Sequence, residues 1–303
     1  MKLVVKNTDI SQLYASIEWS GDIKQRSRSI SVTYLYAPGA GFPLVEAHEG
    51  DAVALFDDTR KQRFIGAITK VQSKLSGDEV KFTARDILWY TSRNKAAGVY
   101  KGTPDDITRK ICGEFNITIE SLPEPAVQKQ KKVISTGDKT IHDVITEAYG
   151  DGYHIQAVDK RLAVSATGSE VVAVISGEAN LLDADYSSSI ENMVNRVQII
   201  DKNGKILGTV QNDSDLQYGI LQDVYKKEKD KDAQAEARKM LKGKDTSSSI
   251  ECLGNWDCVA GKSIYILDTS NSMFGKFLIT DDKHTFSGGV HQMTLGVEVA
   301  GTA

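Results

Sequence analysis

The sequence lacks long apolar runs and a large excess of charge of one sign. No stretch approaches the roughly 18 to 20 apolar residues of a membrane span, and the start, MKLVVKNTDISQ, turns polar too early for a signal peptide. The formal net charge of -4 gives no electrostatic support to a nucleic-acid or anionic-membrane partner. We therefore expect folding in the cytoplasm, with no membrane span and no recognition of nucleic-acid sequence.

Cysteine is scarce, and the three present are Cys112, Cys252 and Cys258. An odd number in a chain of 303 residues argues against a disulfide framework. Cys252 and Cys258 lie further apart than the cysteines of a zinc knuckle, and no second Cys or His pair is near them. We expect partly buried, ordinary thiols.

Catalytic patterns are also missing. There is no Gly-x-Ser-x-Gly elbow and no recognisable Ser-His-Asp or Cys-His arrangement. AGKS at 260–263 resembles the end of a phosphate-binding loop, but Trp256 stands where the first glycine belongs, and a strand-like SIYIL follows. We expect no enzymatic activity and no cofactor.

One stretch, DDKHTFSGGVH, could bind a metal if its acidic and histidine side chains converged across paired strands. The alternative interpretation is an exposed hairpin around a Ser-Gly-Gly turn, which the sequence favours. The candidate metal ligands are Asp281, Asp282, His284 and His291.

The hydrophobic pattern predicts a mainly β protein with an α+β insertion: two similar small β-barrel domains and a central α/β region. Residues 1–98 contain short alternating runs typical of a barrel. Residues 99–186 include a helix capped by Thr103 and a hairpin at 153–166. Residues 187–303 form the second barrel domain, including a helix at about 229–242.

An internal repeat supports the two barrels. Shifting the chain by 211 residues aligns 50–83 with 261–294 without a gap and gives seven identities, where ordinary composition gives roughly two. The alternative is two unrelated hairpins with similar turn residues. Matched positions include Gly50 with Gly261, Val53 with Ile264, Leu55 with Ile266, Asp57 with Asp268, Ile68 with Ile279, Thr69 with Thr280, Leu75 with Phe286, Ser76 with Ser287, Gly77 with Gly288, Phe82 with Met293 and Thr83 with Thr294.

The stretch SSSIENMVNRVQIID at 187–201 precedes Asn203-Gly204 and KILGTV, which predicts the first arm of a β-hairpin. Alternation places Met193, Asn195, Val197 and Ile199 on one mostly apolar side. We expect this strand to open the second barrel with that side inward. The expected structural or interface residues are Trp19, Asp57, Asp268, Asn192, Arg196 and Gln198.

SIEWSGDIKQRSRSISVTY resembles the N-terminal signature of the baseplate hub proteins of contractile phage tails and tailocins, which are related to late-control D proteins. Further marks of that family are GDAVALF, KFTARDILWYTSRNKA, LGNWDCVAGKSIYI and FLITDDKHTFSGGVHQMTL. Together these motifs extend from Trp19 to Leu295. Family members often begin with extra residues, so the resemblance implies a reduced N-terminal arm here.

The resemblance implies a homotrimer at the distal end of a tail tube. Two similar barrels in each subunit would present six in a ring, which matches a hexameric tube above to a trimeric spike below. The implied partners are the tube protein, the spike protein and other baseplate proteins. Assembly in the host cytoplasm and release within a virion or tailocin would follow. The alternative function is a tail-associated cell-wall hydrolase or wall-binding protein.

Overall fold

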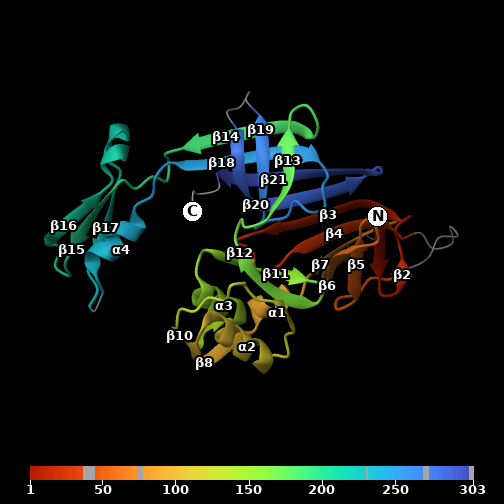
Figure 1. Ribbon diagram of the computed structural model, residues 1–303, viewed down its shortest axis with the longest axis horizontal. Helices are drawn as coiled ribbons and strands as arrows, with labels where there is room; N and C mark the ends of the chain where they lie inside the picture. Colours follow the sequence, from red (N-terminus) through yellow and green to blue (C-terminus); the bar gives the residue numbers. More distant parts are fainter. Residues whose placement is uncertain (37–44, 74–77, 230, 269–272, 300–303) are drawn as a thin grey trace. The chain divides into compact units, whose positions relative to one another are not determined.

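The computed structural model describes the chain except for residues 37–44, 74–77, 230, 269–272 and 300–303. The chain forms two compact units. The first consists of Met1–Ala184 together with Ser249–Ala303, and the second of Asp185–Ser248 (Figure 1).

A 13-stranded sheet dominates the first unit. Its N-terminal half, here called the first barrel, follows the order β1-β5-β6-β7-β4-β3, and the short β2 pairs with β1. Alternate side chains point into one core, in which Ile17, Val32 and Phe82 are almost fully buried. The strands are β1 (Lys2–Val5), β2 (Thr8–Asp9), β3 (Tyr14–Asp22), β4 (Ser29–Leu35), β5 (Ala52–Phe56), β6 (Gln62–Ser73) and β7 (Glu79–Arg85).

The second half of the sheet, here called the second barrel, follows the order β13-β19-β20-β21-β18-β14. Ile250, Ile264, Ile279 and Leu295 lie in its core with no exposed surface. Its strands are β13 (Val171–Ser176), β14 (Leu181–Ser189), β18 (Asp245–Leu253), β19 (Ser263–Asp268), β20 (Met273–Ser287) and β21 (Val290–Val299). The chain leaves the first unit along β14 and returns along β18.

The sequence repeat is a structural repeat in its first two strands. Ala52 pairs with Ala67 in the first barrel, and the equivalent residues, Ser263 and Leu278, pair in the second. The turn before each hairpin is also the same. The Gly50 N–H donates to Ile68 O at 2.8 Å, the Gly261 N–H donates to Ile279 O at 2.9 Å, and both glycines have φ near +90°.

The offset of 211 is wrong for the returning strand. Val71 pairs with Phe82 in the first barrel, whereas the equivalent of Val71, Asp282, pairs with Leu295. Phe82 therefore corresponds to Leu295 and not to Met293, which is a shift of two residues. Because strand side chains alternate with a period of two, this shift keeps the same side inward. Positions 75–77 lie outside the described residues.

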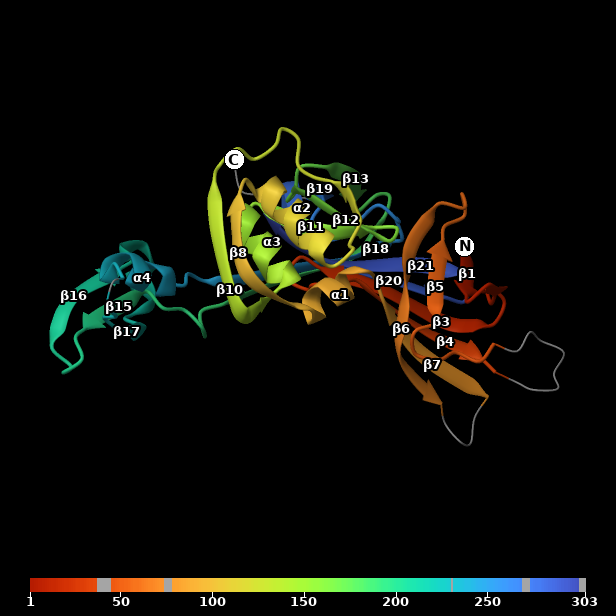
Figure 2. The same ribbon diagram turned by 90° about the horizontal axis from the view of Figure 1, so that it is seen from below.

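The central α/β region packs three helices around two small sheets within the first unit (Figure 2). α2 begins as the sequence predicts, at Thr103, which forms a reciprocal capping box with Asp106. α3 begins with the same kind of box, between Thr140 and Asp143. The elements are α1 (Leu88–Arg93), β8 (Lys95–Gly102), α2 (Pro104–Glu114), β9 (Ile119–Ser121), β10 (Lys131–Thr140), α3 (Ile141–Tyr149), β11 (Tyr153–Val158) and β12 (Arg161–Ala166).

The second unit has its own small core. The sheet β16-β15-β17 carries α4 on one side, where Val197, Ile199 and Ala237 are buried together. The predicted hairpin is present as β15 and β16. The elements are β15 (Arg196–Ile200), β16 (Ile206–Gln211), the 3-10 helix η1 (Asp213–Tyr218), β17 (Gln222–Lys226) and α4 (Ala233–Met240).

The expectation that residues 187–201 open the second barrel is wrong. β15 belongs to the separate sheet of the second unit, and the second barrel begins with β13, inside the predicted middle region 99–186. A single barrel domain over 187–303 is therefore also wrong, because 185–248 is a compact unit of its own. The predicted fold class, mainly β with two similar barrels and a central α/β region, is confirmed.

Candidate functional site

The two barrels are joined by strand pairing. The last seven residues of β20, 281–287, pair antiparallel with residues 16–22 of β3, from Asp281 with Asp22 to Ser287 with Ser16 (Figure 1). We call these two segments the β3–β20 seam. The earlier part of β20 pairs with β19 of its own barrel. One long strand is therefore shared by both barrels, which makes them parts of one hydrogen-bonded sheet.

A buried ion pair crosses the seam. Arg28 donates from Nη1 to Asp282 Oδ1 at 2.8 Å and from Nη2 to Oδ2 at 2.5 Å. The Asp282 carboxylate also accepts from the Ala260 N–H at 2.6 Å. The guanidinium carbon of Arg28 lies 4.2 Å from the centre of the Trp19 ring. Because Asp282 is only 2 % exposed, the ion pair is largely removed from water.

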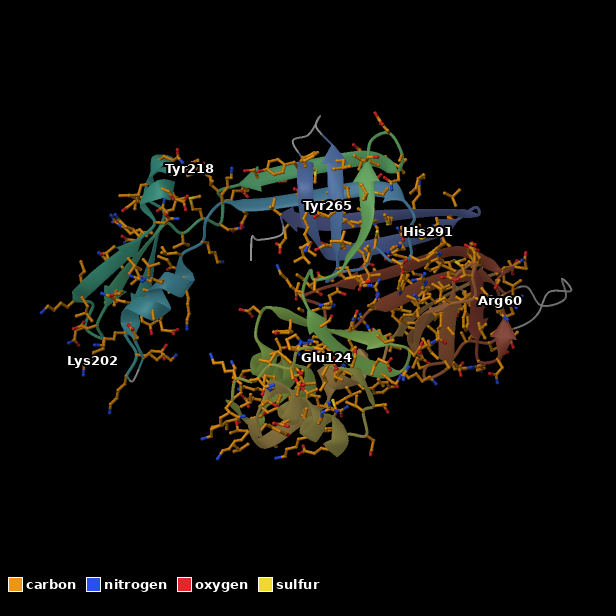
Figure 3. All side chains as sticks on the ribbon, in the orientation of Figure 1. Arg60, Glu124, Lys202, Tyr218, Tyr265 and His291 are labelled. Atoms are coloured by element: carbon orange, nitrogen blue, oxygen red, sulfur yellow. The ribbon has the colours of Figure 1, made fainter. Side chains whose placement is uncertain are left out.

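Aromatic rings fill the space beside this ion pair. Trp19 lies 4.9 Å from His284 and 5.8 Å from Trp256, measured between ring centroids. Phe286 stacks on Trp256 at 4.6 Å and on His291 at 4.2 Å. Figure 3 shows His291 on the second barrel. Trp19 of the first barrel and Trp256 of the loop before β19 therefore pack against each other beside the seam.

The two histidines of this cluster bond to each other. His284 Nδ1 lies 3.0 Å from His291 Nε2, and His284 Nε2 lies 3.0 Å from the carbonyl oxygen of Cys258. Because a carbonyl only accepts, the proton of neutral His284 belongs on Nε2, and His291 then donates to Nδ1. Burial lowers the pKa of both histidines to about 4, so both rings are neutral at pH 7.

A second charged group ties the first barrel to the loop before β19. Asp57 accepts from Arg63 Nε at 2.7 Å, and Arg63 Nη1 also donates to Asp257 at 2.5 Å. Burial alone would raise the pKa of Asp57, but hydrogen bonds from Thr59, Arg63 and Lys61 lower it to about 2. This carboxylate therefore stays charged and holds the β5–β6 turn and Arg63 in place.

Three of the four candidate metal ligands lie next to one another, because His284 Nδ1 is 3.0 Å from His291 Nε2 and His284 Nε2 is 3.5 Å from Asp282 Oδ2. Asp282 and His284 lie on the buried side of β20, whereas Asp281 is exposed. The carboxylate oxygens of Asp282 and both ring nitrogens of His284 already have hydrogen-bond partners within the protein. Among the residues that the structure describes, no group of three or more His, Cys, Asp or Glu side chains is arranged to hold a metal ion.

The remaining predicted interface residues are not residues of the seam. Asn192, Arg196 and Gln198 belong to the second unit, where Arg196 Nε donates to Gln222 at 2.6 Å. The side chain of Asp268 lies outside the described residues.

Sequence reasoning missed Arg28, Arg63 and Asp257. Arg28 is 254 positions from Asp282, so no local pattern in the sequence points to their pairing.

The asparagine in the predicted apolar side of β15 has a structural use. Asn195 has no exposed surface, and its amide donates to Asp215 O at 3.1 Å and to Gly219 O at 2.7 Å. Its side-chain oxygen accepts from the Leu221 N–H at 2.9 Å. The buried amide is thus fully bonded and fixes the segment around η1 against the sheet.

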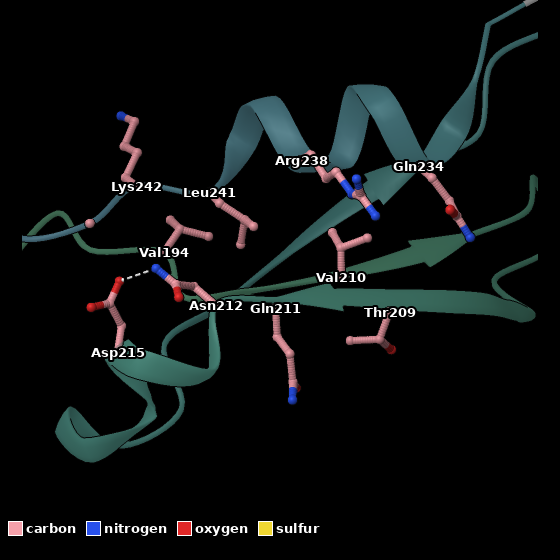
Figure 4. Close-up of a pocket in the computed structure, with 11 residues that line it drawn as sticks. Val194, Thr209, Val210, Gln211, Asn212, Asp215, Gln234, Arg238, Leu241 and Lys242 are labelled. Carbon is pink, nitrogen blue, oxygen red and sulfur yellow. Dashed lines mark hydrogen bonds between the residues drawn. The ribbon is translucent and has the colours of Figure 1, made fainter. Parts of the chain in front are cut away.

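A pocket of about 600 Å³ lies beside this segment, within the second unit (Figure 4). Val194, Val210 and Leu241 form its apolar part, and Arg238 and Lys242 are at its edge. Asn212 donates to Asp215 at 2.8 Å across one end. The charged residues of its lining are Asp215, Arg238 and Lys242.

Two further expectations concern the cysteines and the membrane. All three cysteines are buried and free, and burial raises the pKa of each thiol to about 12, as expected for unreactive thiols. In the parts of the chain that the structure describes, no helix is long and apolar enough to cross a membrane.

Comparison with known proteins identifies the family. A family model described as YqbQ-like matches residues 17–298, which is most of the chain. The chain belongs to the YqbQ-like family. The uncharacterized protein YqbQ of Bacillus subtilis strain 168 is 27 % identical, and the match covers 97 % of this chain and 95 % of YqbQ. The phage-like element PBSX protein XkdQ of the same strain is 26 % identical, with the same coverage of both chains.

Solved structures share the fold of this YqbQ-like chain. The tail protein from Neisseria meningitidis MC58 matches with a TM-score of 0.73 and 14 % identity over 99 % of this chain and 97 % of that one. The 43 kDa tail protein of prophage MuSo2 from Shewanella oneidensis gives a TM-score of 0.71 and 13 % identity, with 98 % and 96 % covered. The E. coli c3393 protein is a type VI secretion component described as similar to T4 tail proteins gp27 and gp5. It matches with a TM-score of 0.58 and 11 % identity over 99 % of this chain and 77 % of that one. The predicted resemblance to phage tail proteins is confirmed.

Proposed function

We propose that this YqbQ-like protein is a structural subunit of a phage-type tail, and that it forms the baseplate hub. The names of its relatives support a tail role, because one is a protein of a phage-like element and two proteins of the same fold are tail proteins. In this role the chain acts by assembly. Its partners are further copies of itself, the tube protein, the spike protein and other baseplate proteins.

The observation that carries the proposal is the repeated barrel. Two hairpins with the same turn glycine, equivalent hydrogen bonds and equivalent register lie in one continuous sheet. Rings of different symmetry can dock only if the same local surface recurs at matching angles. Three chains with two barrels each present six similar surfaces, so a trimer of this protein can match a hexameric tube on one side and a trimeric spike on the other.

The chemistry of the described residues fits a structural role. Asp282 and the two histidines bond to protein partners at the β3–β20 seam, and Asp57 bonds to Arg63 beside the β5–β6 turn. Arg28, Arg63 and Asp257 line a pocket of about 520 Å³, where Arg28 is paired with Asp282 and Arg63 with Asp257. The runner-up, a tail-associated cell-wall hydrolase, has no specific feature of the described residues in its favour.

The decisive experiment is electron cryomicroscopy of particles that contain the tagged full-length protein. We expect three copies at the distal end of the tube, each contributing two barrels to one ring. Six copies, or a position away from the end of the tube, would contradict the hub assignment. Purified protein should not release soluble fragments from cell walls, and release of such fragments would favour the hydrolase.

A further inference from the structure

The outer edge of β16 is open within the second unit. The sheet of this unit has the order β16-β15-β17, so β15 covers one edge of β16, and no strand of the described chain covers the other. β16 has the sequence ILGTVQ, without a proline or a charged residue. Proteins usually protect an edge strand with such residues, because a bare edge attracts another strand. The sequence of β16 provides no such protection.

The hydrogen bonds of β16 show which of its backbone groups face this edge. The N–H of Asn212, just after the strand, donates to Asn195 O at 2.9 Å, so the backbone of Asn212 faces β15. Consecutive residues of an antiparallel strand turn their N–H and C=O groups to alternate edges. Val210 therefore faces β15, and Thr209 and Gln211 present their N–H and C=O groups at the open edge.

The pocket of the second unit lies along the open edge, with α4 as its other wall. Gln234 and Arg238 are one turn apart on the same side of α4, and both line this pocket of about 600 Å³. Thr209 and Gln211 also line it, although Figure 4 shows their side chains pointing away from α4. The edge of β16 therefore forms one wall. We call this pocket the β16–α4 groove.

The groove carries two exposed basic side chains. Arg238 and Lys242 line it, and neither forms an ion pair with a carboxylate of the described chain. The one acidic residue of the lining, Asp215, already accepts from Asn212 at 2.8 Å. Residues 233–244 contain four lysines and arginines and one glutamate, in a chain with a net charge of -4. The groove is therefore a basic site on an acidic chain, which complements an acidic ligand.

We propose that the β16–α4 groove binds an extended segment of a partner protein, which adds a strand to β16 and carries an acidic side chain. The alternating N–H and C=O groups of the open edge are satisfied together by another extended backbone, which presents the same alternation. A phosphate ion or a phosphate backbone presents acceptors without this alternation and cannot pair with the edge. The inference goes beyond the proposed function, because it assigns the chemistry of a partner and is tested on the purified protein.

The groove also sets the side-chain pattern of the bound segment. Side chains on one side of a strand are an even number of positions apart. Those that face α4 meet an apolar part of the groove, formed by Val194, Val210 and Leu241, and a basic part, formed by Arg238 and Lys242. We therefore expect an apolar residue and an aspartate or glutamate that are separated by one or three other residues.

The test begins with a random library of short peptides, selected on immobilised full-length protein and counter-selected on the bare support. The most enriched sequence, made as a synthetic fluorescent peptide, is the probe for binding measurements by anisotropy. We expect it to bind with a Kd below about 100 μM and to show the apolar and acidic pattern given above.

Two matched charge variants test the contact with α4. Arg238→Glu should weaken peptide binding about tenfold or more, because repulsion replaces attraction at the acidic residue of the peptide. The control is Lys239→Glu, which makes the same change of charge in the same turn of α4 at a residue outside the lining of the groove. It should change the Kd by less than about threefold, because an exposed charge outside the contact is screened.

Strand addition is tested at the edge itself. Thr209→Pro removes an N–H from the open edge and leaves the ladder to β15 intact, so it should weaken binding about tenfold or more. The control, Thr209→Val, keeps the N–H and should bind the peptide as the wild type does. In the wild type, bound peptide should also slow hydrogen exchange of the Thr209 and Gln211 amides, a measurement that does not depend on how a variant folds.

Circular dichroism melts establish that each variant keeps its fold. The inference would be overturned if no peptide were enriched on the full-length protein, if Arg238→Glu and Lys239→Glu had equal effects, or if the peptide left the exchange of the Thr209 and Gln211 amides unchanged. Binding that is lost with Arg238→Glu and Thr209→Pro but kept in both controls would establish the β16–α4 groove as a peptide site.

Discussion

At the scale of single residues, the connection between the barrels depends most on the Arg28–Asp282 pair. Replacing Asp282 with alanine leaves the guanidinium buried without its carboxylate, and breaking a buried pair in this way costs about 3 to 5 kcal/mol. We expect this loss in the free energy of unfolding, measured by urea denaturation. The matched control is Glu120→Ala, which removes the partner of the half-exposed Arg161 at 2.5 Å and should cost about 0 to 1 kcal/mol. Equal losses for the two variants would contradict the role given to the seam.

Single residues also show where sequence reasoning succeeds and where it stops. The alternation that places Met193, Asn195, Val197 and Ile199 on one side is correct, since all four are buried. The same alternation fits any sheet with one covered face. It could not reveal that α4, and not the second barrel, covers this side.

At the scale of elements, local signals predict helices and turns well. The capping residues Thr103 and Thr140 mark the starts of α2 and α3, and the turn at Asp159 and Lys160 closes the hairpin of β11 and β12. These features depend on neighbours in the sequence. The two-residue difference between the returning strands β7 and β21 depends on the length of each hairpin, which an alignment without gaps conceals.

The repeated glycines allow a comparison between equivalent elements. Gly50 and Gly261 share the same positive φ, so alanine at either position strains the backbone by about 1 to 2 kcal/mol. A Cβ at position 50 meets no atom within 4 Å, whereas one at position 261 would lie 2.4 Å from the His154 ring. We expect Gly261→Ala to destabilise the protein by at least about 1 kcal/mol more than Gly50→Ala, as measured by urea denaturation.

The variant His154→Ala provides the control for this comparison. In a chain that carries His154→Ala, the new Cβ at position 261 no longer meets the imidazole ring. Gly50→Ala and Gly261→Ala should then lower the free energy of unfolding by the same amount. If Gly261→Ala remains the more costly variant there, the difference between the repeats has a cause other than His154.

At the scale of the whole molecule, the connection between the barrels could not be read from the sequence, although the duplication could. Residues that meet in the β3–β20 seam are separated by more than 250 positions, and their pairing follows from how the whole sheet is assembled. The repeat at an offset of 211 was visible because evolution of a fold preserves turn geometry, here two glycines with φ near +90°. No local sequence signal marks the borders of the second unit. These borders, at 185 and 248, fall within the continuous strands β14 and β18.

The second unit should unfold independently of the barrels. Among the residues of this unit that the structure describes, four apolar side chains are buried, Met193, Val197, Ile199 and Ala237, and none of them belongs to the core of the second barrel. A segment of about 60 residues with so small a core is marginally stable. Scanning calorimetry of the full chain should therefore show a minor transition below the main one. Replacing residues 190–244 with a short Gly-Ser linker should remove the minor transition and shift the main Tm by less than about 4 °C, equivalent to roughly 1 kcal/mol or less. A single transition in the full chain, or a shortened chain that does not fold, would mean that the barrels need the second unit for their stability.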